Sequence, residues 1–299
     1  MSENGTGKTV LITGGTSGIG KEASRQLARA GWRVVVHGRD ERKGRDAVEE
    51  LRAATGNGDV HLLLADLASL HSVRKGADEF RRRFGRIDVL IANAAASPGG
   101  VPKRRETTDG FEFFFGTNYL GHYLLVRLLL DLLLASAPSR IVVVGGRQMG
   151  AEFDFDDLQM EQNWKPFRAI LQAKLGMFCM TRELTRRLTH TGITANVLDP
   201  GMVQTPYHDG AGKVLRLLIR LLGTSPQNAA ETYTWLATSP DLARVSGNLY
   251  SARKVVPFKG QAADDEVVRR IWAESARLVG VPEDIEELGV TDLEGERTR

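Results

Sequence analysis

The sequence is poor in cysteine, and its charges nearly balance. The only cysteine among its 299 residues is Cys179, which excludes an internal disulfide framework and any zinc site that needs two or more thiolates. Its 40 basic and 37 acidic residues leave a formal net charge of +3, which is too small and too evenly spread for a nucleic-acid-binding surface. We therefore expect a cytoplasmic protein that does not bind nucleic acid.

Long uncharged apolar runs are also missing. Residues 1–8 are polar and lack the charged and apolar regions of a signal peptide. The most apolar helix candidate, 117–134, carries His122, Arg127 and Asp131, which makes it a poor membrane span. We expect no integral membrane segment and an ordinary globular core.

Short apolar runs alternate with helical patterns up to about residue 200. This alternation predicts a parallel sheet with crossover helices on both faces, because the strand runs are continuously apolar. We predict one α/β domain, a Rossmann-like doubly wound sheet, at 8–281, with a flexible segment at 1–7 and a loosely held acidic tail at 282–299. The expected strands are 9–13, 33–37, 60–65, 89–93, 141–144 and 194–198.

Local signals mark several helix ends. Gly31 follows the first predicted helix, 21–30, where a glycine lets the chain turn back. Ser225 is expected to cap a later helix, with Pro226 as its first residue. Cys179 lies within a helix predicted at 174–188 and is expected to be a buried packing residue and not a nucleophile.

A glycine-rich turn joins the first strand to the first helix. It reads Thr13-Gly14-Gly15-Thr16-Ser17-Gly18-Ile19-Gly20. At this place in a strand–helix–strand unit, backbone amides and a helix N-terminus can face a pyrophosphate. The simpler alternative is a tight turn that needs glycine only for its backbone angles.

Further motifs follow the later strands and complete a pattern. The sequence has Asp66-Leu67 after the third strand, Asn93-Ala94-Ala95 after the fourth, Asn118 in a helix, and the segment 200–205 after the sixth. With the spacing of Gly14, Gly18 and Gly20, they make the chain resemble the short-chain dehydrogenase/reductase family over roughly residues 8–280. Its retinol-dehydrogenase-like branch is the most similar.

The resemblance implies a dinucleotide site. In such relatives the glycine turn holds the pyrophosphate, the aspartate after the third strand lies by the adenine, and the asparagine after the fourth strand stabilises the nearby sheet edge. The helix lysine binds the ribose, and the segment after the sixth strand meets the nicotinamide. The corresponding residues are Gly14, Thr16, Ser17, Gly18, Ile19, Gly20, Asp66, Leu67, Asn93, Ala94, Lys174, Pro200, Gly201, Val203 and Thr205.

The end of the second strand bears on the choice of cofactor. It reads His37-Gly38-Arg39, without the carboxylate that would accept the adenine ribose hydroxyls. The planar guanidinium of Arg39 can pair with a 2′-phosphate, so we predict NADP(H). The alternatives are an exposed loop charge at Arg39, or a role for the neighbouring Asp40.

The reaction centre departs from the family pattern. The family places a tyrosine four residues before the lysine on one helical face, where the ammonium lowers the phenol pKa. Here that stretch is Ile170-Leu171-Gln172-Ala173-Lys174, and Gly146 stands where a serine belongs. No tyrosine lies between Tyr123 and Tyr207, so no shift of the alignment restores the pair. Lys174 and Asn118 remain as the catalytic candidates.

Three functions are compatible with these losses. The first is an atypical NADP(H)-dependent oxidoreductase for an apolar, polycyclic or conjugated substrate such as a quinone, an iminium ion or an enone, whose reduction needs little acid catalysis. The second is a non-redox cyclase, dehydratase or isomerase. The third is a catalytically silent NADP-binding protein.

A few side chains near the expected site could take over proton transfer or contact the substrate. They are Lys174, Arg147, Gln148, Tyr207 and His208, and Ile170 would line the substrate space. Each also has a simpler role: ribose binding for Lys174, loop surface for Arg147 and Gln148, and packing of a substrate lid at 202–223 for Tyr207 and His208. Asn118 could anchor a water chain to Lys174 or only bend its helix.

Assembly is expected from the resemblance. Relatives commonly form dimers or tetramers through two long helices, which correspond here to 117–134 and 174–188. The leucine-rich first helix is compatible with an interface, although a contact within the core would explain it equally well.

Overall fold

Eight strands form one sheet in the order β3-β2-β1-β4-β5-β6-β7-β8. The computed structural model describes residues 5–97, 99, 101–204 and 223–285. All neighbouring strands are parallel except β7 and β8, which are antiparallel. The strands are β1 (Thr9–Thr13), β2 (Arg33–Gly38), β3 (Val60–Leu64), β4 (Val89–Ala92), β5 (Ser139–Val144), β6 (Ile193–Asp199), β7 (Leu249–Ser251) and β8 (Lys254–Val256).

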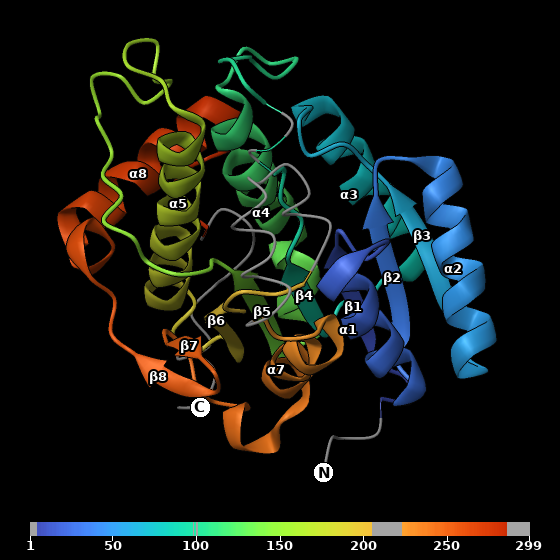
Figure 1. Cartoon of the computed structure of the whole chain (residues 1–299). Coiled ribbons are helices and arrows are strands. Elements are labelled where there is room, and N and C mark those ends of the chain that lie inside the picture. Colours follow the sequence, from blue (N-terminus) through green and yellow to red (C-terminus); the bar gives the residue numbers. More distant parts are fainter. Residues whose placement is uncertain (1–4, 98, 100, 205–222, 286–299) are drawn as a thin grey trace.

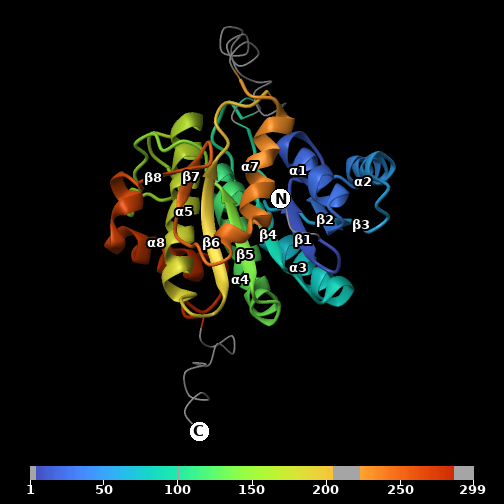
Figure 2. The same ribbon diagram turned by 90° about the horizontal axis from the view of Figure 1, so that it is seen from below.

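Helices cover both faces of this sheet, as Figures 1 and 2 show. Helices α1 (Gly18–Arg29), α2 (Glu41–Thr55) and α7 (Pro226–Thr238) pack on one face. Helices α3 (Leu70–Phe84), α4 (Gly121–Ala135) and α5 (Pro166–Arg187) pack on the other, with α8 (Asp265–Val279) against α5 and α4. Short turns of helix are η2 (Phe115–Leu120), η4 (Pro240–Leu242) and η5 (Gly260–Ala263). The doubly wound α/β fold is confirmed.

The order of the strands reverses between β1 and β4. From β1 the chain moves outward to β2 and β3, and it then returns to β4 on the other side of β1. In sheets of this kind, ligands bind outside the carboxyl ends of the strands at such a reversal. The glycine turn after β1 and the Asn93 loop after β4 both start there.

The element ends show where the sequence signals were sufficient. The six expected strands are confirmed to within two residues at each end, Gly31 has a φ of +84°, and the Ser225 hydroxyl accepts the Asn228 amide. The expected start of α5 at Lys174 is wrong, because Pro166 opens the helix eight residues earlier. Lys174 and Ile170 therefore lie one turn apart on the same helix.

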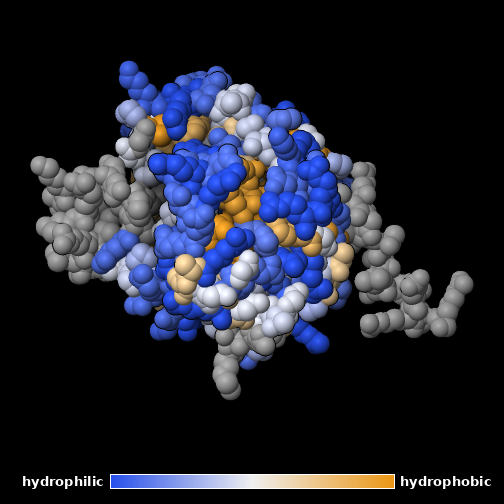
Figure 3. Space-filling view, turned by 90° about the vertical axis from the view of Figure 1, so that its right-hand side faces the viewer, coloured by the Kyte–Doolittle hydropathy of each residue, from blue (hydrophilic) through white to orange (hydrophobic). Residues whose placement is uncertain are grey.

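Two arginines donate hydrogen bonds to backbone carbonyls of the edge strand β3. Arg52 donates to the carbonyl of Val60 at 2.7 Å, and Arg83 donates to that of Leu62 at 2.9 Å. The side of the molecule seen in Figure 3, where β3 and α2 lie, shows an apolar stripe between hydrophilic residues. Charged side chains on an edge oppose pairing with another strand, so this apolar edge is protected from strand addition.

The predicted dimer helices are covered by the protein's own chain. Helix α8 packs on both α4 and α5, and the hydroxyls of Tyr119 and Tyr123 bond to Ser275 and to the Trp272 carbonyl of α8. Within the described residues, Phe115–Ala135 is the one helix long and apolar enough to cross a membrane, and it is mostly buried in this core. A dimer that uses the outer faces of both helices would have to displace α8.

A buried arginine fixes the segment after α8. Arg127, on α4, donates to the carbonyls of Pro282, Glu283 and Asp284 at 2.6–3.4 Å, and its guanidinium lies 4.9 Å from the Trp272 ring centroid. Ile285 is also buried. The expectation of a loose tail therefore fails for residues 282–285, because their carbonyls satisfy a buried charge.

Truncation after Val281 should destabilise the protein strongly. It leaves the Arg127 guanidinium without three of its acceptors, and an uncompensated buried charge costs about 3–5 kcal/mol. The control is a chain that ends at Ile285, which keeps all of these contacts and should lose less than about 0.5 kcal/mol. Urea unfolding measures both, and equal stability of the two chains would contradict this role of Arg127.

Candidate active site

The glycine turn after β1 brings the start of α1 against the strand. Gly14 and Gly18 have φ angles of +66° and +54°, which favour glycine. A Cβ on Gly20 would lie 2.4 Å from the Gly14 carbonyl oxygen, and one on Gly15 would lie 2.9 Å from Val36. The turn therefore needs glycine both for its backbone angles and for close packing.

The N-terminus of α1 is open. Ser17 precedes the helix with extended backbone angles, but its hydroxyl makes no capping hydrogen bond. In contrast, side chains of Asp40, Ser69, Ser225 and Asp264 cap α2, α3, α7 and α8. The first-turn amides of α1, which include those of Ile19 and Gly20, are thus available to an anion at the positive end of the helix dipole.

The loop after β4 is tied to the same turn. The Thr13 hydroxyl accepts the amides of Asn93 at 2.7 Å and Ala94 at 2.9 Å. The Asn93 side chain donates to the Thr13 carbonyl at 2.8 Å and accepts the Tyr233 hydroxyl at 3.1 Å. These bonds occupy the Asn93 amide from both sides, so its role is to hold the loop beside the glycine turn.

The end of β2 carries an exposed cation beside an occupied carboxylate. Arg39 is exposed and makes no hydrogen bond or ion pair with the described part of the chain. Asp40 accepts the Lys43 amide at 3.0 Å as the cap of α2, and this hydrogen bond lowers the pKa of Asp40. Because the Asp40 carboxylate serves the helix, Arg39 is the free charged group here.

Buried polar groups lie just behind this end. His37 is buried, and neither of its ring nitrogens has a hydrogen-bond partner among the described residues. Burial lowers the pKa of His37 to about 4, although the charge of Asp66 raises this pKa by a smaller amount. Asp66 itself accepts the Ala68 amide at 3.0 Å. Leu67 is fixed by the start of α4, where a Cβ on Gly121 would lie 2.3 Å from its carbonyl oxygen.

Ile170 and Gly146 leave Lys174 without its expected neighbours. Ile170 is 3% exposed and belongs to the hydrophobic core, so at the position where the resemblance predicts a tyrosine the side chain is a packing residue. Gly146 has a φ of +83°, and a Cβ there would lie 2.8 Å from the Lys174 Nζ. The amine therefore lies against the bare backbone of Gly146. It has no hydrogen bond or ion pair within the described ranges.

A carboxylate that was not predicted from the sequence lies near Lys174. Asp199 is buried at the end of β6 and accepts the Gly201 amide at 2.9 Å. Burial lowers the pKa of Lys174, and the charge of Asp199 opposes this effect. Its position directly before Pro200-Gly201 was the only available signal, and it could not show that β6 and α5 bring the two groups together.

Asn118 lies in a widened turn of helix. Its segment, η2, is a π-helix, a feature that often marks functional sites. The Asn118 side chain accepts the Ala96 amide at 2.6 Å and donates to the Ala96 carbonyl at 3.2 Å. Its side chain therefore holds the loop after β4. The backbone carbonyl accepts a hydrogen bond from His122 and has a second lone pair for water.

The remaining predicted substrate residues are only partly placed. Arg147 is exposed, while the Gln148 amide donates to the Pro257 carbonyl at 2.9 Å and accepts the Lys259 amide at 2.8 Å. Gln148 therefore clamps two loops together. Val203 pairs with Thr224 at the base of the predicted lid. Thr205, Tyr207 and His208 lie outside the described residues, as does most of the lid.

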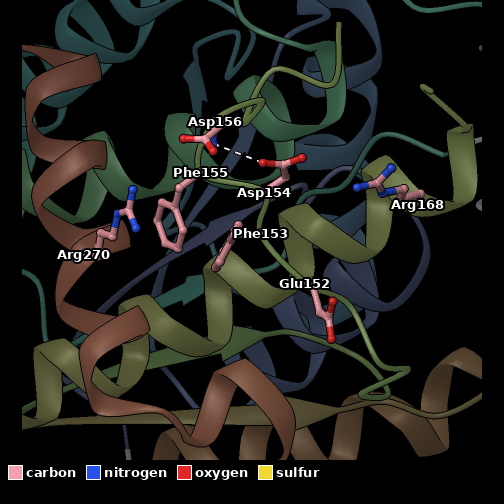
Figure 4. Close-up of a pocket in the computed structure, with 7 residues that line it drawn as sticks. All are labelled: Glu152, Phe153, Asp154, Phe155, Asp156, Arg168 and Arg270. Carbon is pink, nitrogen blue, oxygen red and sulfur yellow. Dashed lines mark hydrogen bonds between the residues drawn. The ribbon is translucent and has the colours of Figure 1, made fainter. Parts of the chain in front are cut away.

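A surface cavity of about 410 Å³ lies beside the N-terminal turn of α5. Figure 4 shows Arg168 and Arg270 around it with the segment 152–156, and Arg270 lies 4.0 Å from the Phe155 ring centroid. Arg168 is two residues before Ile170, which places it on another face of the helix. This polar cavity is separate from the Lys174 face.

Cys179 is buried on α5, and burial raises the pKa of its thiol to about 12. This keeps the sulfur protonated and unreactive, which confirms its role in packing. No group of three or more His, Cys, Asp or Glu side chains in the described ranges could hold a metal ion.

The buried histidines should make the fold acid-labile. Burial lowers the pKa of His37 and of His122 to about 4, so between pH 6.5 and 4 only the unfolded chain binds these protons, and stability falls with pH. At pH 5 each histidine should have removed about 2 kcal/mol of the stability present at pH 7.

Unfolding of His37→Leu at pH 7 and pH 5 checks this prediction. The variant should lose about 2 kcal/mol less than the native protein over this range. His71→Gln, which changes an exposed histidine, is the control and should leave the pH dependence unchanged. If His37→Leu is as acid-sensitive as the native chain, the buried neutral state of His37 is wrong.

Comparisons with known proteins agree with this geometry. Residues 8–156 match the family described as short chain dehydrogenase. Retinol dehydrogenase 13 of Homo sapiens is 41% identical over 287 residues, which cover 92% of this chain and 85% of that protein. Polyprenol dehydrogenase of Mus musculus is 39% identical over 285 residues, with 92% and 84% covered.

Solved structures show the same fold. An uncharacterized protein from Mycobacterium Paratuberculosis has a TM-score of 0.76 at 29% identity, covering 94% of this chain and 96% of that one. The Pseudomonas aeruginosa RhlG/NADP active-site complex has a TM-score of 0.67 at 25% identity, with 83% and 95% covered. The chain therefore belongs to the short-chain dehydrogenase family of oxidoreductases, in its retinol-dehydrogenase-like branch.

Proposed function

We propose that this protein is an NADP(H)-dependent oxidoreductase that acts on an apolar, conjugated substrate without a tyrosine–serine acid pair. One observation carries the proposal: the dinucleotide-binding turn is intact, while the tyrosine position is a core isoleucine, Ile170, and the serine position is the bare backbone of Gly146. The names of the relatives, retinol and polyprenol dehydrogenases, support an apolar substrate.

The residues present fit NADP(H). The open N-terminus of α1 and the glycines that a Cβ would obstruct suit a pyrophosphate. Arg39 is available for a 2′-phosphate, and the Asp40 carboxylate that would favour ribose hydroxyls is occupied. The NADP bound in the RhlG structure supports the same choice. When bound, the nicotinamide would supply or accept a hydride.

The missing side chains restrict the chemistry. A positioned general acid contributes about 10²–10⁴ in rate, and an oxyanion donor about 10²–10³; these effects act together and do not simply multiply. Reduction of a simple ketone needs both, because it produces an alkoxide. Reduction of a quinone or an enone yields a stabilised anion, and reduction of an iminium ion yields a neutral amine. All three reactions therefore need less acid catalysis and less oxyanion stabilisation.

Lys174 is the proton donor that the chain retains. Its Nζ lies beside Gly146, one turn after Ile170, where a reacting oxygen would otherwise meet the tyrosine. Because burial lowers the pKa of Lys174, its ammonium is a stronger acid than an exposed lysine. It can hydrogen-bond to the developing enolate or phenolate and then protonate it. Asp199 keeps a negative charge nearby and favours the ammonium form.

A non-redox enzyme is the second candidate. Because burial lowers the pKa of Lys174, its ammonium loses a proton more easily than that of an exposed lysine, and such a lysine can serve as a base. This suits an isomerase, dehydratase or cyclase. A cofactor-binding protein without turnover is the third candidate.

The cytoplasmic location and the dimeric or tetrameric state remain predictions. An oligomer would have to use a surface other than the faces of α4 and α5 that α8 covers.

Stereospecific deuterium transfer tests the proposed reaction. NADPH labelled at either face of C4 is incubated with menadione, cyclohexenone or cyclohexanone, and the products are examined by mass spectrometry and NMR. We expect one face only to deliver deuterium to carbon in the enone product, and no deuterium in the product from cyclohexanone. With menadione, whose hydroquinone exchanges the transferred hydrogen with water, the same face is identified by loss of deuterium from the recovered NADP⁺. Turnover that persists after NADPH is removed would select the non-redox enzyme, and tight binding with no turnover would select the silent protein.

Two variants separate the roles at the reaction centre. Lys174→Met should reduce turnover of the conjugated substrates by about 10²-fold or more, the loss of a general acid. Ile170→Tyr should not create cyclohexanone reduction, because Gly146 still lacks a hydroxyl and its φ of +83° disfavours any side chain. Efficient cyclohexanone reduction by Ile170→Tyr would contradict this account.

Arg39 should determine the preference of the protein for NADPH over NADH. Arg39→Asp removes the charge-assisted pair with the 2′-phosphate and introduces repulsion, so the dissociation constant for NADPH should rise about 10- to 100-fold. That for NADH should change by much less. Arg29→Asp makes the same charge change at the far end of α1 and is the control. Fluorescence titration measures all of them, and equal effects on both cofactors would contradict the choice of NADP(H).

A further inference from the structure

A histidine connects the two halves of the candidate site. His122 lies in the first turn of α4 with no exposed surface. Its Nε2 is 2.9 Å from the Thr13 hydroxyl oxygen at the end of β1. Its Nδ1 is 3.1 Å from the Asn118 backbone carbonyl oxygen in η2. It therefore contacts both the glycine-turn strand and the widened helix turn.

These contacts determine which ring nitrogen carries the proton. A carbonyl oxygen can only accept, so the bond to Asn118 requires a hydrogen on Nδ1. Burial lowers the pKa of His122 to about 4, and His37, which faces it from β2, acts in the same direction. The ring is therefore neutral at pH 7, Nε2 has no hydrogen, and the Thr13 hydroxyl donates to it.

The Thr13 hydroxyl is fully used in this arrangement. Its oxygen already accepts the amides of Asn93 and Ala94, and its single hydrogen has two possible acceptors. The Ile91 carbonyl oxygen lies at 3.4 Å and the His122 Nε2 at 2.9 Å. The shorter contact is the stronger hydrogen bond, so the Thr13 hydroxyl accepts from the loop after β4 and donates to His122.

The bonds close into a ring of three segments. Thr13 holds the start of the loop after β4, the Asn118 side chain holds Ala96 in the same loop, and His122 joins the Asn118 carbonyl back to Thr13. Every link is buried or partly buried. Movement of η2 would therefore break bonds that also fix the loop beside the glycine turn.

We propose that His122 is a positioning residue that, in its Nδ1–H form, locks the η2 turn carrying Asn118 to the nucleotide-binding turn at Thr13. Nucleotide affinity and the placement of Asn118 are then coupled, although His122 contacts neither the nucleotide nor the substrate. The inference goes beyond the proposed function, which enters only because NADPH serves as the reporter in one of two tests.

The first test needs no ligand. In protein labelled with ¹⁵N-histidine, the His122 signals are assigned by their loss in His122→Gln. At pH 7 we expect the neutral Nδ1–H form, and in Thr13→Val we expect the Nε2 signal to shift because its donor is gone. An Nε2–H form, a charged ring or rapid exchange between the two neutral forms would overturn the proposal. This outcome stays informative even if the protein binds no NADPH.

The second test measures coupling. His122→Gln should raise the dissociation constant for NADPH about tenfold, the loss of about one hydrogen bond. Thr13→Val also loses the acceptor of the Asn93 and Ala94 amides, so it should raise the constant at least as much, and the double variant should bind no more than about twofold worse than Thr13→Val. His122→Asn, which can keep the donor to Asn118 but not the acceptor for Thr13, should match His122→Gln.

Tyr123→Phe is the matched control for this series. It removes two buried hydrogen bonds outside the ring, the one donated to the Trp272 carbonyl and the one accepted from Arg127. It should lower thermal stability as His122→Gln does, but leave the NADPH dissociation constant within about twofold. Fully additive effects of Thr13→Val and His122→Gln, or an equal loss of affinity in Tyr123→Phe, would overturn the coupling.

Discussion

The contact of Gly20 with the Gly14 carbonyl sets the geometry on which the site depends. With 2.4 Å between that oxygen and the place of a Cβ, no other residue allows α1 to begin so close behind β1. The open helix end consequently lies at the point where the strand order reverses, next to the loop that follows β4. Thr13, the last residue of β1, can then hydrogen-bond both to the loop after β4 and to His122 of α4.

The departure from the family pattern is integrated into the core. Ile170 occupies its position as a packed residue, and Gly146 adopts backbone angles that suit glycine. Neither residue offers a polar side chain to Lys174, and within the described part of the chain Asp199 is the charge that acts on its amine. On the proposed function, the chain keeps the binding half of a dehydrogenase site and lacks the usual groups of the half that handles protons.

Much of this could be predicted from local patterns. The six longer strands, the glycine turn and the caps at Gly31 and Ser225 follow from periodicity and turn chemistry, which act over a few residues. The strands β7 and β8, with three residues each, are too short for periodicity to appear. The early start of α5 follows from Pro166, a local signal, whereas the use of Asp40 as a helix cap depends on the hydrogen bond formed.

Other features depend on contacts between distant segments. Asp199 lies near Lys174 only because β6 and α5 are neighbours in the fold, and the Asn118 side chain bonds to Ala96 because η2 lies beside the loop after β4. The covering of α4 and α5 by α8 and the fixed segment 282–285 belong to the same class. A pattern along the chain indicates which residues are polar or apolar, but it does not indicate which polar groups interact across the sheet.

The bonds of Arg127 to the backbone at 282–284 have a consequence for biosynthesis. The arginine is translated about halfway along the chain, but its acceptors are translated more than 150 residues later. Until they leave the ribosome, a nascent α4 carries an unmatched cation at a position destined for the interior. The surroundings of Arg127 on α4 are therefore completed only when residues 282–284 are in place, which links the closing of this part of the core to a late step of synthesis.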